Sequence, residues 1–143
     1  MAGPRHQKRR IRFPDKLLNG EGYTPTALKV LALTAVLTTL TETPVTAYEV
    51  AQILGIEADT ARRWLRFWTR KGLIKALKER ERGRGHKARY FYPEPMEKGI
   101  GKAKSNGYFE IPQWELELLL SVGIPDVVLA IALVLHRHAN GEG

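Results

Sequence analysis

The stretch TAYEVAQILGIEADTARRWLRFWTRKGLI, residues 46–74, contains two short amphipathic patterns separated by a glycine. Thr46 and Glu49 have the spacing of a capping box, in which the two residues satisfy each other's free backbone donors at a helix start. Gly55 is suited to end the first helix, because a turn there can need a positive φ. We therefore predict a short helix, a turn at Gly55 and a second helix over about 58–71.

The second predicted helix has two chemically different faces. On a period of 3.6 residues, one face is apolar and the opposite face is basic. The apolar face contains Ala61, Trp64, Leu65 and Trp68, and the basic face contains Arg62, Arg63, Arg66 and Arg70. A helix that buries one face and presents arginines on the other is suited to reading base edges or binding phosphates in the major groove.

The candidate DNA-reading residues of this helix are Asp59, Thr60, Arg62, Arg63, Arg66 and Arg70. Thr60 suits either a base edge or a phosphate. Asp59 does not suit a phosphate, so it either caps the helix or orients Arg62 or Arg63. A solvated surface helix is the alternative interpretation of the arginine row.

A β-hairpin is predicted after this helix, from strands over 73–79 and 88–92 with Gly83 and Gly85 near the tip. An arginine-bearing narrow tip can enter the minor groove, and phosphate contact alone is the second possibility. The candidate DNA-binding residues here are Lys78, Arg80, Arg82, Arg84, His86, Lys87 and Arg89. Tyr90, Phe91 and Tyr92 alternate, and core packing explains them better than base stacking.

Residues 26–92 resemble the winged helix-turn-helix regulator superfamily, in the broad sense that includes MarR-like and ArsR-like repressors. Leu54-Gly55-Ile56 stands where that family has its turn, and Lys71-Gly72-Leu73-Ile74 stands where its recognition helix enters the wing. The resemblance implies a mainly α fold with a small β-hairpin wing, an α+β class, and binding to double-stranded DNA. We expect this domain to span 23–93.

The charge is unevenly distributed along the chain. Residues 1–104 carry 22 basic and 10 acidic side chains, whereas residues 105–143 carry a net charge of −4. Such asymmetry predicts that the first part meets a polyanion. Residues 1–22 are expected to form a basic flexible arm, in which Ile11–Leu18 is the segment that could be ordered. This arm either contacts DNA or is a solubilising tail. Its candidate DNA-binding residues are Arg5, Lys8, Arg9, Arg10 and Arg12.

Residues 94–107 are interpreted as a linker, and 108–143 as a C-terminal helical segment. Its helix over 126–138 is apolar nearly all round, so we expect a homodimer formed by the C-terminal helices and helix 26–40. A second interpretation rests on two segments, Gly107 to Pro112 and Leu135 to Gly141. They resemble the opening of winged-helix domains in plasmid and phage replication initiators, in which an extended Phe-x-x-Pro segment precedes two helices and an Arg-His-x-Asn-Gly corner. On that view 108–143 begins a second winged helix. We predict no internal repeat in the chain.

Several classes of function are not expected. The chain has no cysteine, no His-x-x-x-His pair and no phosphate loop, so we expect no metal, no cofactor and no enzyme activity. The longest apolar run, Val127–Leu135, is too short to span a bilayer, and no signal peptide is expected. A cytoplasmic, nucleoid-associated transcriptional regulator is the leading prediction. A plasmid or viral replication or maintenance factor is the first alternative, and an RNA-binding or ribosome-associated protein is the second.

Overall fold

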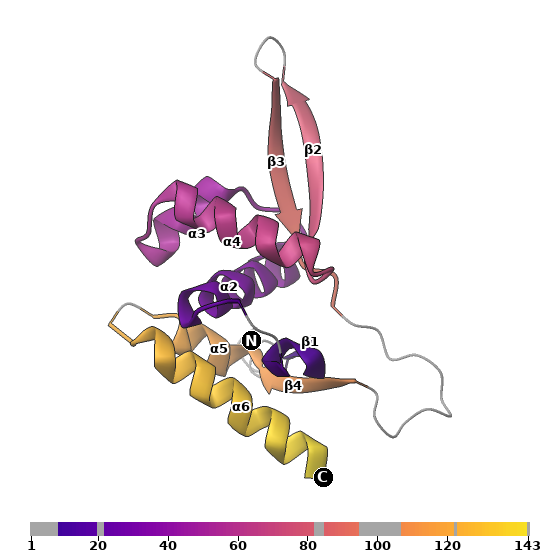
Figure 1. The fold of residues 1–143 in the computed structure, drawn as a ribbon, viewed down its shortest axis with the longest axis vertical. Coiled ribbons are helices and arrows are strands. Elements are labelled where there is room, and N and C mark those ends of the chain that lie inside the picture. The colour runs from indigo at the N-terminus through magenta and orange to yellow at the C-terminus, as the bar shows by residue number, and fades with distance from the viewer. Residues whose placement is uncertain (1–8, 20–21, 82–84, 95–106, 122, 143) are drawn as a thin grey trace, which may run out of the picture. The chain divides into compact units, whose positions relative to one another are not determined.

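The computed structural model describes residues 9–19, 22–81, 85–94, 107–121 and 123–142. Within these residues it contains five α-helices and two small antiparallel sheets, an α+β fold that is mostly helical (Figure 1). The chain divides into two compact units. Unit 1 combines residues 1–25 with 94–143, and unit 2 is the continuous segment 26–93.

Unit 2 is built on three helices followed by a hairpin. The helices are α2 (Pro25–Thr41), α3 (Ala47–Leu54) and α4 (Ala58–Arg70), and the strands are β2 (Lys75–Glu81) and β3 (Gly85–Phe91). The expected helix–turn–helix order of 46–71 is therefore present, with α4 ending one residue before the predicted end. Ala61, Leu65 and Trp68 form the buried face of α4, whereas Trp64 is half-buried beside the Phe67 ring.

Trp68 connects three parts of unit 2. Its indole N–H donates a hydrogen bond of 2.8 Å to the backbone carbonyl of Ala27 in α2, and its side chain is 1% exposed. Its own backbone carbonyl accepts hydrogen bonds from the N–H groups of Leu73 and Ile74, just before β2. Buried polar groups need such partners, so the indole fixes α4 against α2 while its backbone starts the hairpin.

The hairpin strands differ in extent from the predicted 73–79 and 88–92. They pair in antiparallel register from Lys75 opposite Phe91 to Glu81 opposite Gly85. The ladder is held by backbone hydrogen bonds, which do not require apolar side chains. The hydrophobic pattern therefore predicted the first strand to end at 79 and the second to begin at 88, whereas the strands extend to Glu81 and from Gly85. Tyr90 and Tyr92 are buried and Phe91 is half-buried, consistent with the predicted core packing.

Unit 1 is organised around a two-stranded sheet formed by distant parts of the chain. Strand β1 (Arg10–Pro14) pairs antiparallel with β4 (Tyr108–Pro112). The 3-10 helix η1 (Asp15–Asn19) follows β1, and the helices α5 (Gln113–Leu119) and α6 (Asp126–Glu142) follow β4. The core side chains of this unit include Ile11, Phe13, Leu17, Phe109, Ile111, Leu116, Leu129 and Leu133.

Residues 10–19 therefore do not belong to a flexible arm, in contrast to the expectation for 1–22. Ile11 and Phe13 alternate with polar residues and are fully buried, and Phe13 lies 6.0 Å from Phe109 between ring centroids. Two apolar residues give too short a pattern to predict a strand by themselves. Their partner strand lies about a hundred residues further along the chain, beyond the reach of any local pattern.

The residues that form β1 and β4 belong to segments of similar sequence, in contrast to the expectation of no internal repeat. Without gaps, residues 10–37 align with 108–135 at a constant separation of 98 positions. The alignment matches VLALTAVL at 30–37 with VLAIALVL at 128–135, and matches Pro14 with Pro112. In the β1–β4 ladder, Arg12 lies opposite Glu110, which is also its equivalent in the alignment. The pairs on either side of this central pair are exchanged by a two-fold rotation, since Arg10 lies opposite Pro112 and Pro14 opposite Tyr108. The two strands are thus related by a local pseudo-two-fold axis.

Replacing Phe13 tests whether β1 belongs to the folded core. We expect Phe13→Ala to lower the free energy of unfolding by roughly 3–5 kcal/mol, because it removes a fully buried ring. Lys16→Ala, an exposed position in η1, is the matched control and should change stability by less than about 0.5 kcal/mol. Urea unfolding curves of both variants provide the measurement. Equal stability of Phe13→Ala and the wild type would show that residues 10–14 are not packed.

Candidate nucleic-acid interface

The arginine residues of α4 lie on the side opposite its buried face. Arg63, Arg66 and Arg70 are exposed, while Arg62 and Thr60 are half-buried. The buried face fixes this orientation, because Ala61, Leu65 and Trp68 return to the same side of the helix every three or four residues. All six residues predicted on this helix therefore lie on one element, and none of them belongs to its buried face.

Asp59 pairs with Arg62 and does not cap α4. Its carboxylate lies 2.6 Å from Nη1 of Arg62, and Glu57, the residue at the N-cap, makes no side-chain capping bond. Of the two roles considered for Asp59, the structure therefore favours orientation of arginine over capping. The Asp59 side chain is 85% exposed and the Arg62 side chain 44% exposed. Such surface ion pairs contribute little to stability. The ion pair with Asp59 gives the Arg62 guanidinium a defined direction.

The turn between α3 and α4 follows from its sequence. Thr46 and Glu49 form the predicted capping box, with Thr46 Oγ1 accepting from the Glu49 N–H and a Glu49 carboxylate oxygen accepting from the Thr46 N–H. Gly55 has φ of 72° and donates its N–H to the Ala51 carbonyl, so the chain reverses into α4. A side chain larger than glycine is strained in this left-handed region.

The start of α3 lies beside the hairpin. Val45 and Tyr90 exchange two backbone hydrogen bonds, of 2.9 Å and 2.6 Å, in an isolated antiparallel bridge. This bridge brings the first turn of α3, strand β3 and the middle of α4 to a common groove. The cavity has a volume of about 220 Å³ and is lined by Thr46, Ala47, Tyr48, Arg62, Arg66, Ala88 and Tyr90.

The groove combines groups that suit an anion. Arg62 and Arg66 supply positive charge from α4, and Arg62 is paired with Asp59. The first turn of α3 lines the other side of the groove and carries the Glu49 carboxylate of the capping box. The helical pattern predicts the two arginines, but no pattern in the sequence indicates Tyr48, which lines the groove and is 64% exposed. The capping box predicts the helix start, but only the shared lining of the groove shows that this start lies beside Arg62 and Arg66.

The predicted hairpin residues are only partly within the described structure. Lys78 and Arg80 belong to β2, and His86, Lys87 and Arg89 belong to β3. Arg82 and Arg84 lie outside the described residues. In composition, unit 2 carries thirteen basic and six acidic side chains, a net charge of +7, so most of the excess charge of the chain resides in this unit.

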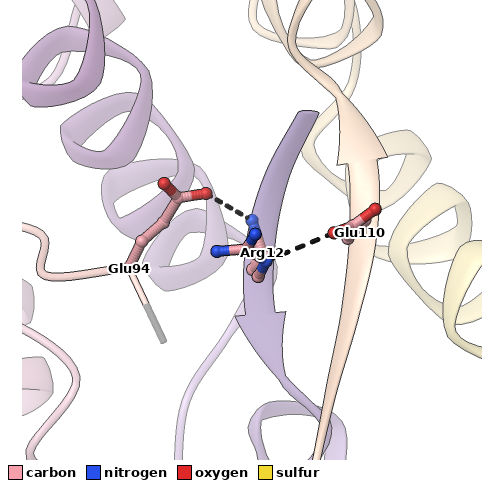
Figure 2. A network of polar contacts seen from close by, with 3 residues as sticks. All are labelled: Arg12, Glu94 and Glu110. Atoms are coloured by element: carbon pink, nitrogen blue, oxygen red, sulfur yellow. Dashed lines mark hydrogen bonds and ion pairs between the residues drawn. The ribbon is translucent and has the colours of Figure 1, made fainter. Parts of the chain in front are cut away.

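Arg12 makes contacts within unit 1 (Figure 2). Its Nε lies 3.2 Å from a carboxylate oxygen of Glu110, and its backbone N–H donates to Glu94 at 2.8 Å. Its guanidinium also stacks over the Tyr108 ring at 5.4 Å. Arg10 is the exposed first residue of β1, and the exposed Arg9 precedes it. Arg5 and Lys8 lie outside the described residues. Arg12 therefore belongs to unit 1, whereas the arginines of α4 belong to unit 2.

Comparisons with protein-family models, with curated proteins and with solved structures found no match for this chain. In the described part of the chain, no helix is long and apolar enough to cross a membrane. The same residues contain no group of three or more histidine, aspartate or glutamate side chains that could hold a metal ion.

The capping box gives a direct test of how the groove is held. We expect Thr46→Ala to lower the free energy of unfolding by about 1 kcal/mol, because the Glu49 N–H loses its side-chain acceptor. Thr46→Ser keeps the hydroxyl and should remain close to the wild type. Chemical denaturation followed by circular dichroism measures both. Indistinguishable curves for the alanine and serine variants would contradict this role of Thr46.

Proposed function

We propose that this protein binds double-stranded DNA through unit 2, folded as a winged helix-turn-helix in which α4 is the recognition helix and β2–β3 is the wing. The observation that carries the proposal is the row of outward arginines on a helix whose other face is buried. A major groove about 12 Å wide accepts one α-helix, and arginine is the most common partner of guanine.

The groove beside α4 supports the proposal by offering a place for a backbone phosphate. Arg62 and Arg66 line it together with Thr46, Ala47 and Tyr48 at the start of α3, and two neighbouring arginines suit a single phosphate group. Arg63 and Arg66 are the exposed arginines nearest the start of α4, so we assign them to base edges or adjacent phosphates. Arg62, oriented by Asp59, is assigned to phosphate or guanine at the edge of the footprint.

Duplex DNA fits this arrangement better than RNA. The major groove of an RNA helix is deep and too narrow for a helix to enter. The positive charge of unit 2 also suits a polyanion and gives strong salt dependence. Among DNA-binding roles, we propose transcriptional regulation, with the protein acting through a preferred operator sequence.

A second role, as a replication or maintenance factor of a plasmid or virus, is favoured by one observation. The repeat places a strand and two helices at 108–142 that correspond to those at 10–41, as expected where a second winged helix begins. Two winged helices in tandem select directly repeated half-sites, whereas a two-fold dimer selects inverted ones. The orientation of half-sites in the preferred DNA therefore distinguishes the two roles.

The proposal is tested by selecting preferred sites from a random duplex pool and then measuring affinity by fluorescence anisotropy. We expect Arg66→Ala to bind the selected duplex about 5- to 150-fold more weakly, a loss of roughly 1–3 kcal/mol, if this arginine contacts a base. If Arg66 contacts a phosphate, all duplexes weaken alike and the salt slope falls by about 0.9.

Lys16→Ala is the control, because it removes one exposed positive charge from unit 1 and should leave affinity nearly unchanged. A structured RNA of equal charge serves as competitor. Equal competition by RNA and duplex DNA at moderate salt, or equal losses in the Arg66 and Lys16 variants, would refute the proposal.

A further inference from the structure

Asp59 is the one acidic residue of α4, and it lies on the face that carries the arginines. On a period of 3.6 residues it shares a row with Arg63 and Arg66, which follow it by four and seven positions. A carboxylate in this row opposes binding to phosphates, because both groups are negatively charged. The helix dipole favours an acid at the start of α4, but the exposed Glu57 at the N-cap already supplies one. What distinguishes Asp59 from Glu57 is its ion pair with Arg62.

This ion pair leaves most of both polar groups available. Oδ1 of Asp59 lies 2.6 Å from Nη1 of Arg62, and neither group makes a second bond within the described part of the chain. A guanidinium has five N–H donors, of which Nη1 carries two. One donor of Nη1 holds Asp59, so the other can form a parallel pair of hydrogen bonds together with a donor of Nη2. Asp59 keeps its second oxygen, Oδ2, as an acceptor beside these two donors.

Two donors beside one acceptor match the major-groove edge of a G·C base pair. Guanine presents two acceptors there, N7 and O6, and cytosine presents the donor of its N4 amino group beside them. We propose, resting on the DNA binding proposed above, that Arg62 binds the guanine and Asp59 accepts from the cytosine, so that together they select G·C at one position of the site. Both residues lie within the first five positions of α4, at the end of a recognition helix that reaches base edges.

The pair also decides between the two partners assigned to Arg62 above. A phosphate held by Arg62 would lie next to the Asp59 carboxylate, whereas a guanine edge brings no negative charge to it. Arg66 forms no ion pair within the described residues and remains for the phosphate. Guanine is therefore the partner that we assign to Arg62.

The carboxylate also weakens binding to DNA that lacks this base pair. Where no amino donor lies opposite Asp59, its charge faces phosphates and base acceptors, and no hydrogen bond offsets the repulsion. The affinity for random DNA is thereby lowered more than the affinity for the preferred site. Asp59 is thus a specificity-determining residue, and its effect is opposite in sign to that of an arginine, which strengthens binding to all DNA.

Asp59→Asn in the full chain tests the proposal, because it removes the charge and keeps the size of the side chain. Sites are selected from a random duplex pool with the wild type and with the variant, and fluorescence anisotropy gives the affinities for selected and random duplexes. We expect the variant to accept A·T where the wild type requires G·C, since asparagine suits adenine. It should bind random duplex more tightly, and the ratio of specific to random affinity should fall by at least about fivefold.

Glu57→Gln is the matched control, since it removes the same charge from an exposed acid that makes no side-chain capping bond. It should strengthen binding to selected and random duplexes alike and leave the selected sequence unchanged. If Asp59→Asn behaves in the same way, the inference is overturned while DNA binding itself stands. A wild type that binds no duplex overturns the proposed function and this inference together.

A modified base separates guanine from phosphate as the partner of Arg62. Replacing the selected guanine by 7-deazaguanine removes the N7 acceptor and leaves every phosphate in place. We expect the wild type to bind this duplex at least about fivefold more weakly, and Arg62→Ala to bind both duplexes equally. An unchanged wild-type affinity, with a salt slope that falls by about 0.9 in Arg62→Ala, would assign Arg62 to a phosphate and contradict the inference.

Discussion

The orientation of the arginine face of α4 depends on the burial of Trp68. The indole is fixed to the Ala27 carbonyl, and Leu65 and Ala61 follow on the same side of the helix, so Arg62, Arg63 and Arg66 have only the outer side left. The Trp68 carbonyl also accepts hydrogen bonds from the N–H groups of Leu73 and Ile74, the two residues that precede β2. A single buried residue thereby positions both elements of the candidate interface.

Local signals predicted α3, the turn and α4 because each is determined within a few residues. The capping box at Thr46 and the left-handed turn at Gly55 depend on neighbours no more than four positions away. The groove and the β1–β4 sheet depend on contacts between distant residues, such as Val45 with Tyr90 and Phe13 with Phe109. Hydrophobic periodicity does not indicate such pairings between distant residues. The similarity of residues 30–37 to 128–135 is the one sequence feature that relates the two segments that contain β1 and β4.

The charge is divided between the two units less sharply than between residues 1–104 and 105–143, which carry net charges of +12 and −4. Unit 1 carries ten basic and nine acidic side chains, and two of its glutamates bind Arg12. Unit 2 retains nearly all of the positive excess. The segment 9–19 is basic in sequence but belongs to a nearly neutral unit, because the sheet brings acidic residues from the other end of the chain to it.

The pairing of β1 with β4 makes unit 2 an insertion within unit 1, and this has a consequence for the order of folding. Unit 2 is continuous, so it can acquire its structure as soon as residues 26–93 have left the ribosome. Strand β1 must wait until Tyr108–Pro112 has been synthesised, and closing so long a segment is entropically costly and slow. During that interval Ile11 and Phe13 are exposed on the nascent chain, so unit 1 completes its core last.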